Sequence, residues 1–262
     1  MTDTPFKFTI LGSGSSGGVP RLGNDWGACD PDEPKNRRSR CSLLVERGGT
    51  AVLIDTSPDL REQMLKTGLD WVDGVLYTHA HADQAHGIDD LRVFALNRMK
   101  RVEIYADAET VDTLTTRFDY CFEGKSGYPP ILMAETVTDK PVRIAAPDGG
   151  GMVEAIPFPV DHGTCMALGW RVGGLAYIPD VLDLTDQARA VLQGLDVFVI
   201  DALRYRPHPT HAHVEKTLEW IAELKPRRAI LTNLHVDLDY QTLKAELPDG
   251  VEPAYDGMVI EL

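Results

Sequence analysis

Histidines that could do chemistry gather in two short stretches of this chain. Of its eight histidines, three lie between positions 79 and 86 and three between 208 and 213. In the first stretch, His79, His81 and Asp83 are two residues apart and follow an apolar run. In a curved loop this spacing lets two imidazoles and a carboxylate converge, and such groups suit Zn, Mn or Fe. The stretch therefore predicts a metal site, with a polar surface loop as the alternative.

A metal site needs further ligands from distant parts of the chain. Three candidates, His162, Asp180 and His235, each stand shortly after an apolar run that has the length of a strand. A rigid sheet often builds a site from the ends of several strands, because the strands fix where the side chains start. We therefore expect these three residues to complete the site.

The residues between these candidates predict the elements that must position them. Short apolar runs alternate with helical periodicity along the chain, which is typical of an α/β protein with more than one sheet. Gly48-Gly49 and Gly173-Gly174 each predict a tight turn between two strands. We expect strands at 6–11, 41–46, 51–54, 74–77, 102–105, 153–160, 167–172, 175–178, 195–201 and 228–232, and helices from Pro58 and at 89–100, 108–118 and 214–224.

Two of these segments carry more specific expectations. The helix at 89–100 is expected to turn one face inward, made of Leu91, Phe94, Ala95 and Met99. The segment 119–140 contains glycines and prolines without periodicity, and it predicts an irregular excursion. We expect residues 1–262 to form a single domain that includes this excursion.

A glycine-rich loop near the N-terminus imitates a dinucleotide-binding motif. Gly12-x-Gly14-x-x-Gly17 has the required spacing after a predicted strand, but no helical period follows it. The motif needs a helix there, whose N-terminal amides face a pyrophosphate. We reject the dinucleotide interpretation. A loop of this kind can still present groups to an anion, so Ser13 is a candidate substrate-binding residue, with a plain tight turn as the alternative.

Charge and composition exclude several classes of protein. The chain has 26 Lys and Arg against 40 Asp and Glu, a net charge of −14, which argues against a surface that grips a long nucleic acid. Its apolar runs are too short to span a bilayer, and Met1–Pro5 lacks the basic start of a signal peptide. The four cysteines include no C-x-x-C pair. We therefore expect a cytoplasmic protein with free thiols and no membrane partner.

The order of the candidate ligands carries a family resemblance. His79-x-His81-x-Asp83, followed by His162, Asp180 and His235, resembles the metallo-β-lactamase superfamily over essentially the whole chain. The segments 86–92 and 209–211, together with Leu231-Thr232-Asn233, make it most similar to the cyclic phosphodiesterase branch. That branch includes the phosphoribosyl 1,2-cyclic phosphate phosphodiesterases, with ribonuclease Z as a more distant cousin.

The resemblance implies an α/β fold, a four-layer αβ/βα sandwich with two divalent metal ions, Zn or Mn, at the sheet edge. His79, His81 and His162 would hold the first metal, Asp83 and His235 the second, and Asp180 would bridge both. The implied reaction is attack of metal-bound hydroxide on a small cyclic phosphate or nucleotide-like phosphodiester.

Other residues near this implied centre could contact the substrate or move a proton. We expect His211 to contact the phosphate or donate a proton to the leaving oxygen, because imidazole can do either near neutral pH. Asp83 is expected to be catalytic as well as a ligand. His208 and Arg37 are further candidate substrate-binding residues, with a solvated surface as the alternative for each.

This chain departs from the superfamily pattern at two places. The superfamily usually has a histidine directly after the Asp83 position, as a ligand of the second metal, and here that residue is Gln84. Three outcomes are open: Gln84 ligates through its oxygen, His86 substitutes for it, or the second site binds weakly. Some relatives also carry a structural zinc on N-terminal cysteines, but only Cys29 lies in that region, so we expect no such site.

Two alternatives to a small-molecule phosphodiesterase are kept. The first is RNA processing like that of ribonuclease Z, which is disfavoured because 119–140 has no cluster of arginines or lysines to grip RNA. The second is a non-catalytic module that binds a metal or nucleotide. The expected partner is a small phosphate-containing substrate, and a homodimer is compatible with the sequence.

Overall fold

The computed structural model describes residues 4–124 and 127–262, and within them the chain divides into two compact units. Unit 1 comprises residues 1–9, 42–157 and 259–262, and unit 2 comprises residues 10–41 and 158–258. The strands β1 (Lys7–Gly12), β8 (Val153–Asp161) and β15 (Met258–Glu261) each contain residues of both units. The single domain over 1–262 stays a prediction, and Met1–Asp3 lie outside the described residues.

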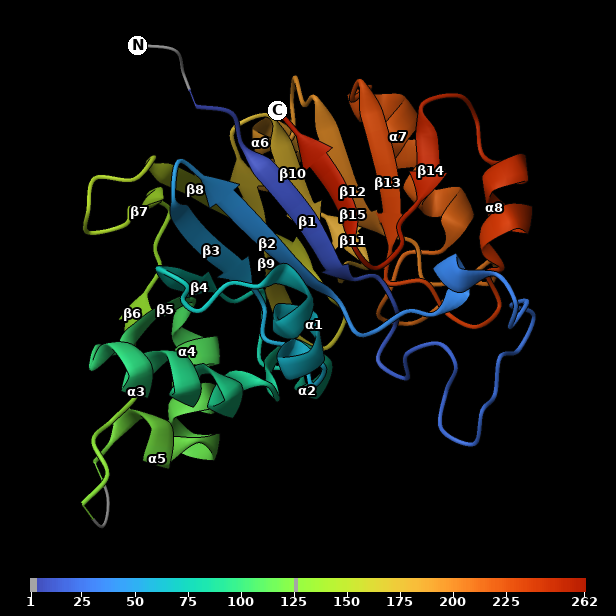
Figure 1. Ribbon diagram of the computed structural model, residues 1–262. Helices are drawn as coiled ribbons and strands as arrows, with labels where there is room; N and C mark the ends of the chain where they lie inside the picture. Colours follow the sequence, from blue (N-terminus) through green and yellow to red (C-terminus); the bar gives the residue numbers. More distant parts are fainter. Residues whose placement is uncertain (1–3, 125–126) are drawn as a thin grey trace. The chain divides into compact units, whose positions relative to one another are not determined.

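The strands of unit 1 follow one another across a mixed sheet (Figure 1). The hairpin expected from Gly48-Gly49 pairs β2 (Ser42–Arg47) with β3 (Thr50–Ile54) in antiparallel register. Then β4 (Gly74–Leu76), β5 (Val102–Ala106) and β6 (Leu132–Thr136) continue in parallel, and β15 and β1 complete the order β15-β1-β2-β3-β4-β5-β6. The core of the sheet is apolar, since every residue of β3 is buried.

Short helices connect the parallel strands of unit 1. They are α1 (Leu60–Thr67), α2 (Ala82–Ala85), the 3₁₀ helix η2 (Ile88–Leu91), α3 (Arg92–Arg98), α4 (Ala108–Arg117) and α5 (Asp119–Phe122). Asp107 caps α4 by accepting a hydrogen bond from the amide of Thr110. The helix α4 packs on β5 and β6, as parallel connections require.

Two expectations for unit 1 are corrected. The helix expected at 89–100 is broken into η2 and α3, and it ends at Met99, whose φ of 50° is left-handed and whose side chain is 83% exposed. Leu91, Phe94 and Ala95 are buried as expected. The segment 119–140 is not irregular throughout, because it contains α5 and β6, whereas its residues 125–126 lie outside the described part of the chain.

Unit 2 has a second mixed sheet, in the order β11-β8-β9-β10-β12-β13-β14, and the short β7 (Val142–Ile144) of unit 1 pairs with the first half of β8. Its further strands are β9 (Met166–Val172), β10 (Leu175–Ile178), β11 (Asp183–Leu184), β12 (Val197–Asp201), β13 (Arg228–Thr232) and β14 (Val251–Pro253). The four strands β10, β12, β13 and β14 are parallel neighbours. Their carboxyl ends therefore meet at one edge of the sheet.

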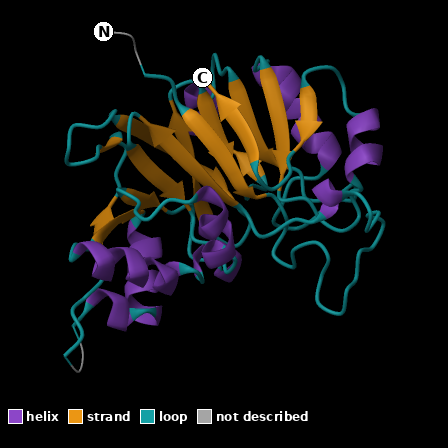
Figure 2. Cartoon of the chain, in the orientation of Figure 1, coloured by secondary structure: helices purple, strands orange, loops and turns teal. Residues whose placement is uncertain are grey.

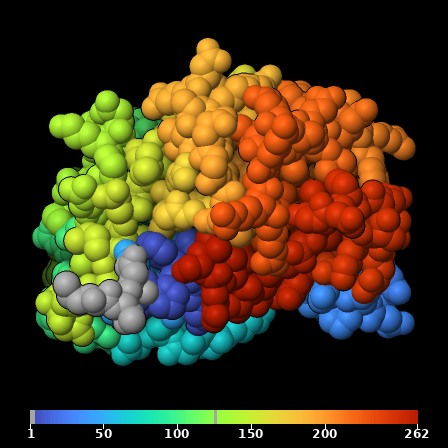
Figure 3. Space-filling view, turned by 90° about the horizontal axis from the view of Figure 1, so that it is seen from above, coloured from blue at the N-terminus to red at the C-terminus, as the bar shows by residue number. Residues whose placement is uncertain are grey.

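Helices lie along this second sheet (Figure 2) and share an apolar core with it. The helices are α6 (Asp186–Val191), α7 (Val214–Leu224) and α8 (Tyr240–Glu246), with a 3₁₀ turn η1 at Pro34–Asn36. Trp220 of α7 and Leu243 of α8 share a core with Phe198 of β12. In α7 the buried face is Val214, Thr217, Trp220 and Leu224, and Leu218 and Ile221 are partly buried beside it. Orange and red segments of unit 2 gather on the face seen in Figure 3.

The two mixed sheets flanked by helices confirm the α/β fold class. Within the described residues, none of the helices is both long and apolar enough to cross a lipid bilayer. The expected cytoplasmic location stays a prediction.

Candidate metal centre

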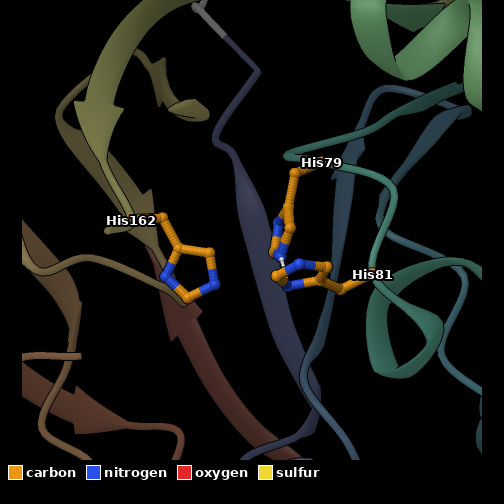
Figure 4. Close-up of side chains that lie close together, drawn as sticks. All are labelled: His79, His81 and His162. Carbon is orange, nitrogen blue, oxygen red and sulfur yellow. Dashed lines mark hydrogen bonds between the residues drawn. The ribbon is translucent and has the colours of Figure 1, made fainter. Parts of the chain in front are cut away.

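In unit 1, a buried relay of hydrogen bonds holds the first predicted ligands. The carboxylate of Asp55, after β3, accepts hydrogen bonds from the backbone amide and the hydroxyl of Thr78, at 2.8 and 2.9 Å. The Thr78 hydroxyl lies 3.0 Å from Nδ1 of His79, and Nε2 of His79 lies 2.9 Å from Nδ1 of His81 (Figure 4). Burial raises the pKa of Asp55 well above its usual range, against the two bonds from Thr78. Hydrogen bonds from Asp55 through Thr78 thus orient the buried ring of His79, whereas His81 is exposed.

The helix α2 carries the next predicted ligands and begins directly after His81. Asp83 is half-buried, whereas the side chain of Gln84 is buried and only 1% exposed. His86 is exposed, and its ring lies edge-on against Phe118, with 5.9 Å between the centroids. The three outcomes for the second metal stay open.

Glycine at position 87 allows this ligand segment to pack closely on the residues that begin α1. A Cβ atom at Gly87 would lie 2.2 Å from the carbonyl oxygen of Ser57 and 2.8 Å from Cβ of Leu60. No real side chain is accommodated at such distances without moving the backbone. The residue therefore lets the turn after α2 pack directly on the start of α1.

In unit 2, His162 follows β8 with its ring orientation fixed by the backbone. Its Nδ1 lies 2.8 Å from the carbonyl oxygen of Thr210. A carbonyl only accepts hydrogen bonds, so Nδ1 carries the proton and Nε2 presents its lone pair. This is how metal-binding histidines are commonly oriented. His162 is also drawn in Figure 4, at the end of its strand.

The carboxyl ends of β10, β12 and β13 bring together a polar group beside His162. Ligand atoms of His162, Asp180 and His211 all lie within 4.8 Å of one another. Nδ1 of His211 lies 2.8 Å from the Asp201 carboxylate and 3.2 Å from the amide nitrogen of Asn233. Burial raises the pKa of Asp201, and the neighbouring His211 lowers it in part. Nitrogen and carboxylate donors at this spacing fit a divalent transition metal.

His235, the last predicted ligand, lies between an acidic side chain and a basic one. Its Nδ1 is 3.2 Å from the carboxylate of Asp237, and its Nε2 is 3.4 Å from Nη1 of Arg21. The ring of His208 lies near that of His211, with 5.1 Å between the centroids. Burial, followed by the charges of His211, Arg204 and His235, lowers the pKa of His208.

The two remaining predicted residues lie in the N-terminal segment of unit 2. Ser13 is fully buried, and both its amide and its hydroxyl donate to Asp256, at 3.0 and 2.9 Å. The expectation that Ser13 binds substrate loses its support, because its donors are used inside the fold. Arg37 is exposed and lies over the ring of Trp26, 5.1 Å from the centroid, so its substrate role stays a prediction.

Four polar residues that hold or contact the predicted ligands were not predicted from sequence: Asp55, Asp201, Asn233 and Arg21. Asp55 and Asp201 each end or directly follow a continuously buried strand, and that signal could have found them. Asn233 directly follows β13, whose last four residues are buried, so the same signal could have found it, whereas Arg21 carries no such signal.

Comparison with known proteins assigns this chain to a family. Residues 50–233 match the family model of the β-lactamase superfamily domain. The chain is 33% identical over 95% of its length to an octanoyltransferase of Porphyromonas gingivalis, but it spans only 50% of that protein.

Solved structures extend the similarity across the chain. A diphosphatase from the PhnP family is 35% identical with a TM-score of 0.90, covering 98% of this chain and 97% of that one. The zinc-bound PqqB of Methylobacterium extorquens has a TM-score of 0.73 at 20% identity, covering 98% of this chain and 100% of that one, which shows a shared fold.

Proposed function

Because the chain belongs to the β-lactamase superfamily, we propose that it is a metal-dependent hydrolase that cleaves a small phosphodiester. The observation that carries this proposal is the group formed by His162, Asp180 and His211, with the Asp201 carboxylate against His211. The group combines metal-binding donors with an imidazole that is held for proton transfer. A purely structural metal site would not need the second feature.

We assign the ligands in two sets. His79, His81 and His162 would hold one metal, Asp83 and His235 the other, and Asp180 would bridge the two, with Gln84 or His86 available to the second. The assignment is supported by the order of these residues in a superfamily member and by the oriented imidazoles of His79 and His162. The zinc of the PqqB structure supports zinc as one candidate, with manganese as the other.

When bound, the metals would supply a Lewis acid and an activated water molecule. Side chains of this protein would hold the attacking water molecule and transfer the protons. The carboxylate of Asp83 would hold the attacking water and accept its proton. The buried Asp201 carboxylate accepts the Nδ1 proton of His211, so Nε2 is the atom that would give a proton to the departing oxygen. A protonated His211 would be stabilised by this carboxylate.

A diphosphate is a second candidate substrate. It is favoured by the 35% identity to a PhnP-family diphosphatase over nearly the whole of both chains. The same residues would serve both reactions, because each is an attack at phosphorus that expels an oxygen. A long nucleic acid is disfavoured by the net charge of −14.

The test is turnover of bis(p-nitrophenyl) phosphate by protein loaded with Mn²⁺ or Zn²⁺, together with metal analysis of the same samples. We expect two metals per chain, release of p-nitrophenol, and stronger binding of the second metal in Gln84→His. One metal per chain and no turnover, unchanged in Gln84→His, would contradict the hydrolase and leave a metal-binding module.

A further inference from the structure

A hairpin in the N-terminal segment of unit 2 places an arginine beside a predicted metal ligand. Arg21 and Asp25 pair across the hairpin through their backbones, and Leu22, Gly23 and Asn24 form its tip. Gly23 and Asn24 have φ of 87° and 60°, the left-handed values that such a tight tip needs. Leu22 is fully exposed, so the hairpin projects from the unit.

The base of this hairpin is fixed to the segment that follows His235. The amide of Ala28 donates to the carbonyl of Val236 at 2.9 Å, and the thiol of Cys29 lies 3.4 Å from the same oxygen. A Cβ atom at Gly27 would lie 2.7 Å from that carbonyl, so only glycine allows this approach. The hairpin and His235 are therefore held in a fixed relation within unit 2.

The guanidinium of Arg21 is oriented rather than freely solvated. Its Nε donates to Oδ2 of Asp25 at 2.9 Å, its Nη2 pairs with the same oxygen, and its Nη1 faces Nε2 of His235 at 3.4 Å. These contacts use three of the five N–H groups of a guanidinium, and the side chain is 43% exposed. Within the described residues, it can thus offer further donors to a ligand at His235.

We propose that Arg21 binds a second, non-scissile anionic group of the substrate, so that the chain prefers a diphosphate-like substrate over a phosphodiester with neutral ends. This inference rests on the proposed hydrolase. A guanidinium matches a phosphate with two parallel hydrogen bonds, and Asp25 pre-orients it at a low entropic cost. A phosphate next to the cleaved one would lie within its reach when the cleaved group is at His235.

The experiment compares two substrates on the metal-loaded protein. They are bis(p-nitrophenyl) phosphate and bis(p-nitrophenyl) diphosphate, with products separated by chromatography. We expect Arg21→Gln to lower kcat/KM for the diphosphate about 10- to 100-fold, and to change that for the monophosphate less than about 3-fold. Arg21→Lys should fall between, because it keeps the charge and loses the fork. The matched control is Arg227→Gln, whose side chain is 86% exposed.

A binding measurement separates this inference from the proposed function. Calorimetric titration with inorganic diphosphate should show a Kd about 10- to 100-fold weaker in Arg21→Gln than in the wild type or in Arg227→Gln. Equal effects on both substrates, or an unchanged diphosphate Kd, would overturn the role of Arg21. Absence of turnover of either ester by the wild type, with the Kd difference intact, would contradict the hydrolase while leaving the anion site supported.

Discussion

His211 combines a ligating position with a catalytic one. Its ring lies within the group that includes His162 and Asp180, yet its Nδ1 faces the buried carboxylate of Asp201 at 2.8 Å. A ligand and a proton donor make different demands, because a ligand needs a neutral imidazole and a donor a protonated one. The Asp201 carboxylate orients the ring through Nδ1, as in a general acid–base histidine, and this is why we assign His211 to proton transfer.

The first prediction separates these roles. His81→Ala should remove a metal and activity together, whereas His211→Ala should keep both metals and lose at least about 100-fold in kcat. Metal analysis and turnover of bis(p-nitrophenyl) phosphate check this, with His213→Ala as the control histidine. Equal metal loss in both variants would show that His211 is a ligand.

The cysteines give a second prediction at the scale of single residues. Cys29, Cys41 and Cys121 are buried, and burial raises the pKa of all three thiols, that of Cys121 to about 12. Cys165 is only half-buried. Because the thiolate is the reactive form, a disulfide reagent should label one thiol in the native protein and four in denaturant. Rapid native labelling that persists in Cys165→Ser would contradict this assignment.

Among the elements, α8 depends on the Asp239 carboxylate, which accepts hydrogen bonds both from the helix and from another segment of the chain. Asp239 caps the helix by accepting from the amide of Thr242 at 3.0 Å, and it also accepts from the side chain of Asn36. Although burial raises its pKa, these bonds and one from the amide of Asp30 lower the pKa to about 2. The cap therefore also ties η1 and the segment before it to α8 within unit 2.

The third prediction concerns this cap. Asp239→Ala should lower the free energy of unfolding by about 1–2 kcal/mol near neutral pH, as the loss of a cap does. Since the folded pKa lies below the usual 3.8, the stabilisation is present above about pH 4 and declines as the pH falls towards 2. Urea unfolding of wild type and variant between pH 3 and 7 measures the difference. A gap that widens as the pH falls would be incompatible with this cause.

At the scale of the whole molecule, bound metal should stabilise the native fold, because a ligand that binds only the folded chain shifts the unfolding equilibrium. A homodimer stays a prediction.

The fourth prediction tests whether His79 and His162 bind the same metal. His79→Ala and His162→Ala should each lose the same metal, leaving one per chain, and a chelator should lower the Tm of the wild type more than that of either variant. The stabilisation by metal should be about 2.7 kcal/mol at 100 times its Kd. Metal analysis and calorimetry give both values. Loss of different metals, or two metals retained by either variant, would contradict the assignment of both histidines to one metal.

The sequence by itself determined the class of elements and the residue types of the candidate centre. Short apolar runs predicted β10 and β13 closely, and helical periodicity predicted α7, because burial and turn chemistry are local properties. The spacing of His79, His81 and Asp83 and the family resemblance supplied the candidate ligands. The break after η2 and the exposure of Met99 were missed, since helical periodicity alone does not show where a helix must end.

Only the tertiary structure decided what each of these side chains can do. The lone pair of His162 is set by the carbonyl of Thr210, the proton of His211 by Asp201, and the orientation of Arg21 by a hairpin fixed beside His235. Ser13 was withdrawn from the site because Asp256, at the other end of the chain, uses its donors. These hydrogen-bond partners lie between 10 and 243 residues apart and leave no local pattern, so the sequence shows which groups are present and the fold decides which of their atoms are available.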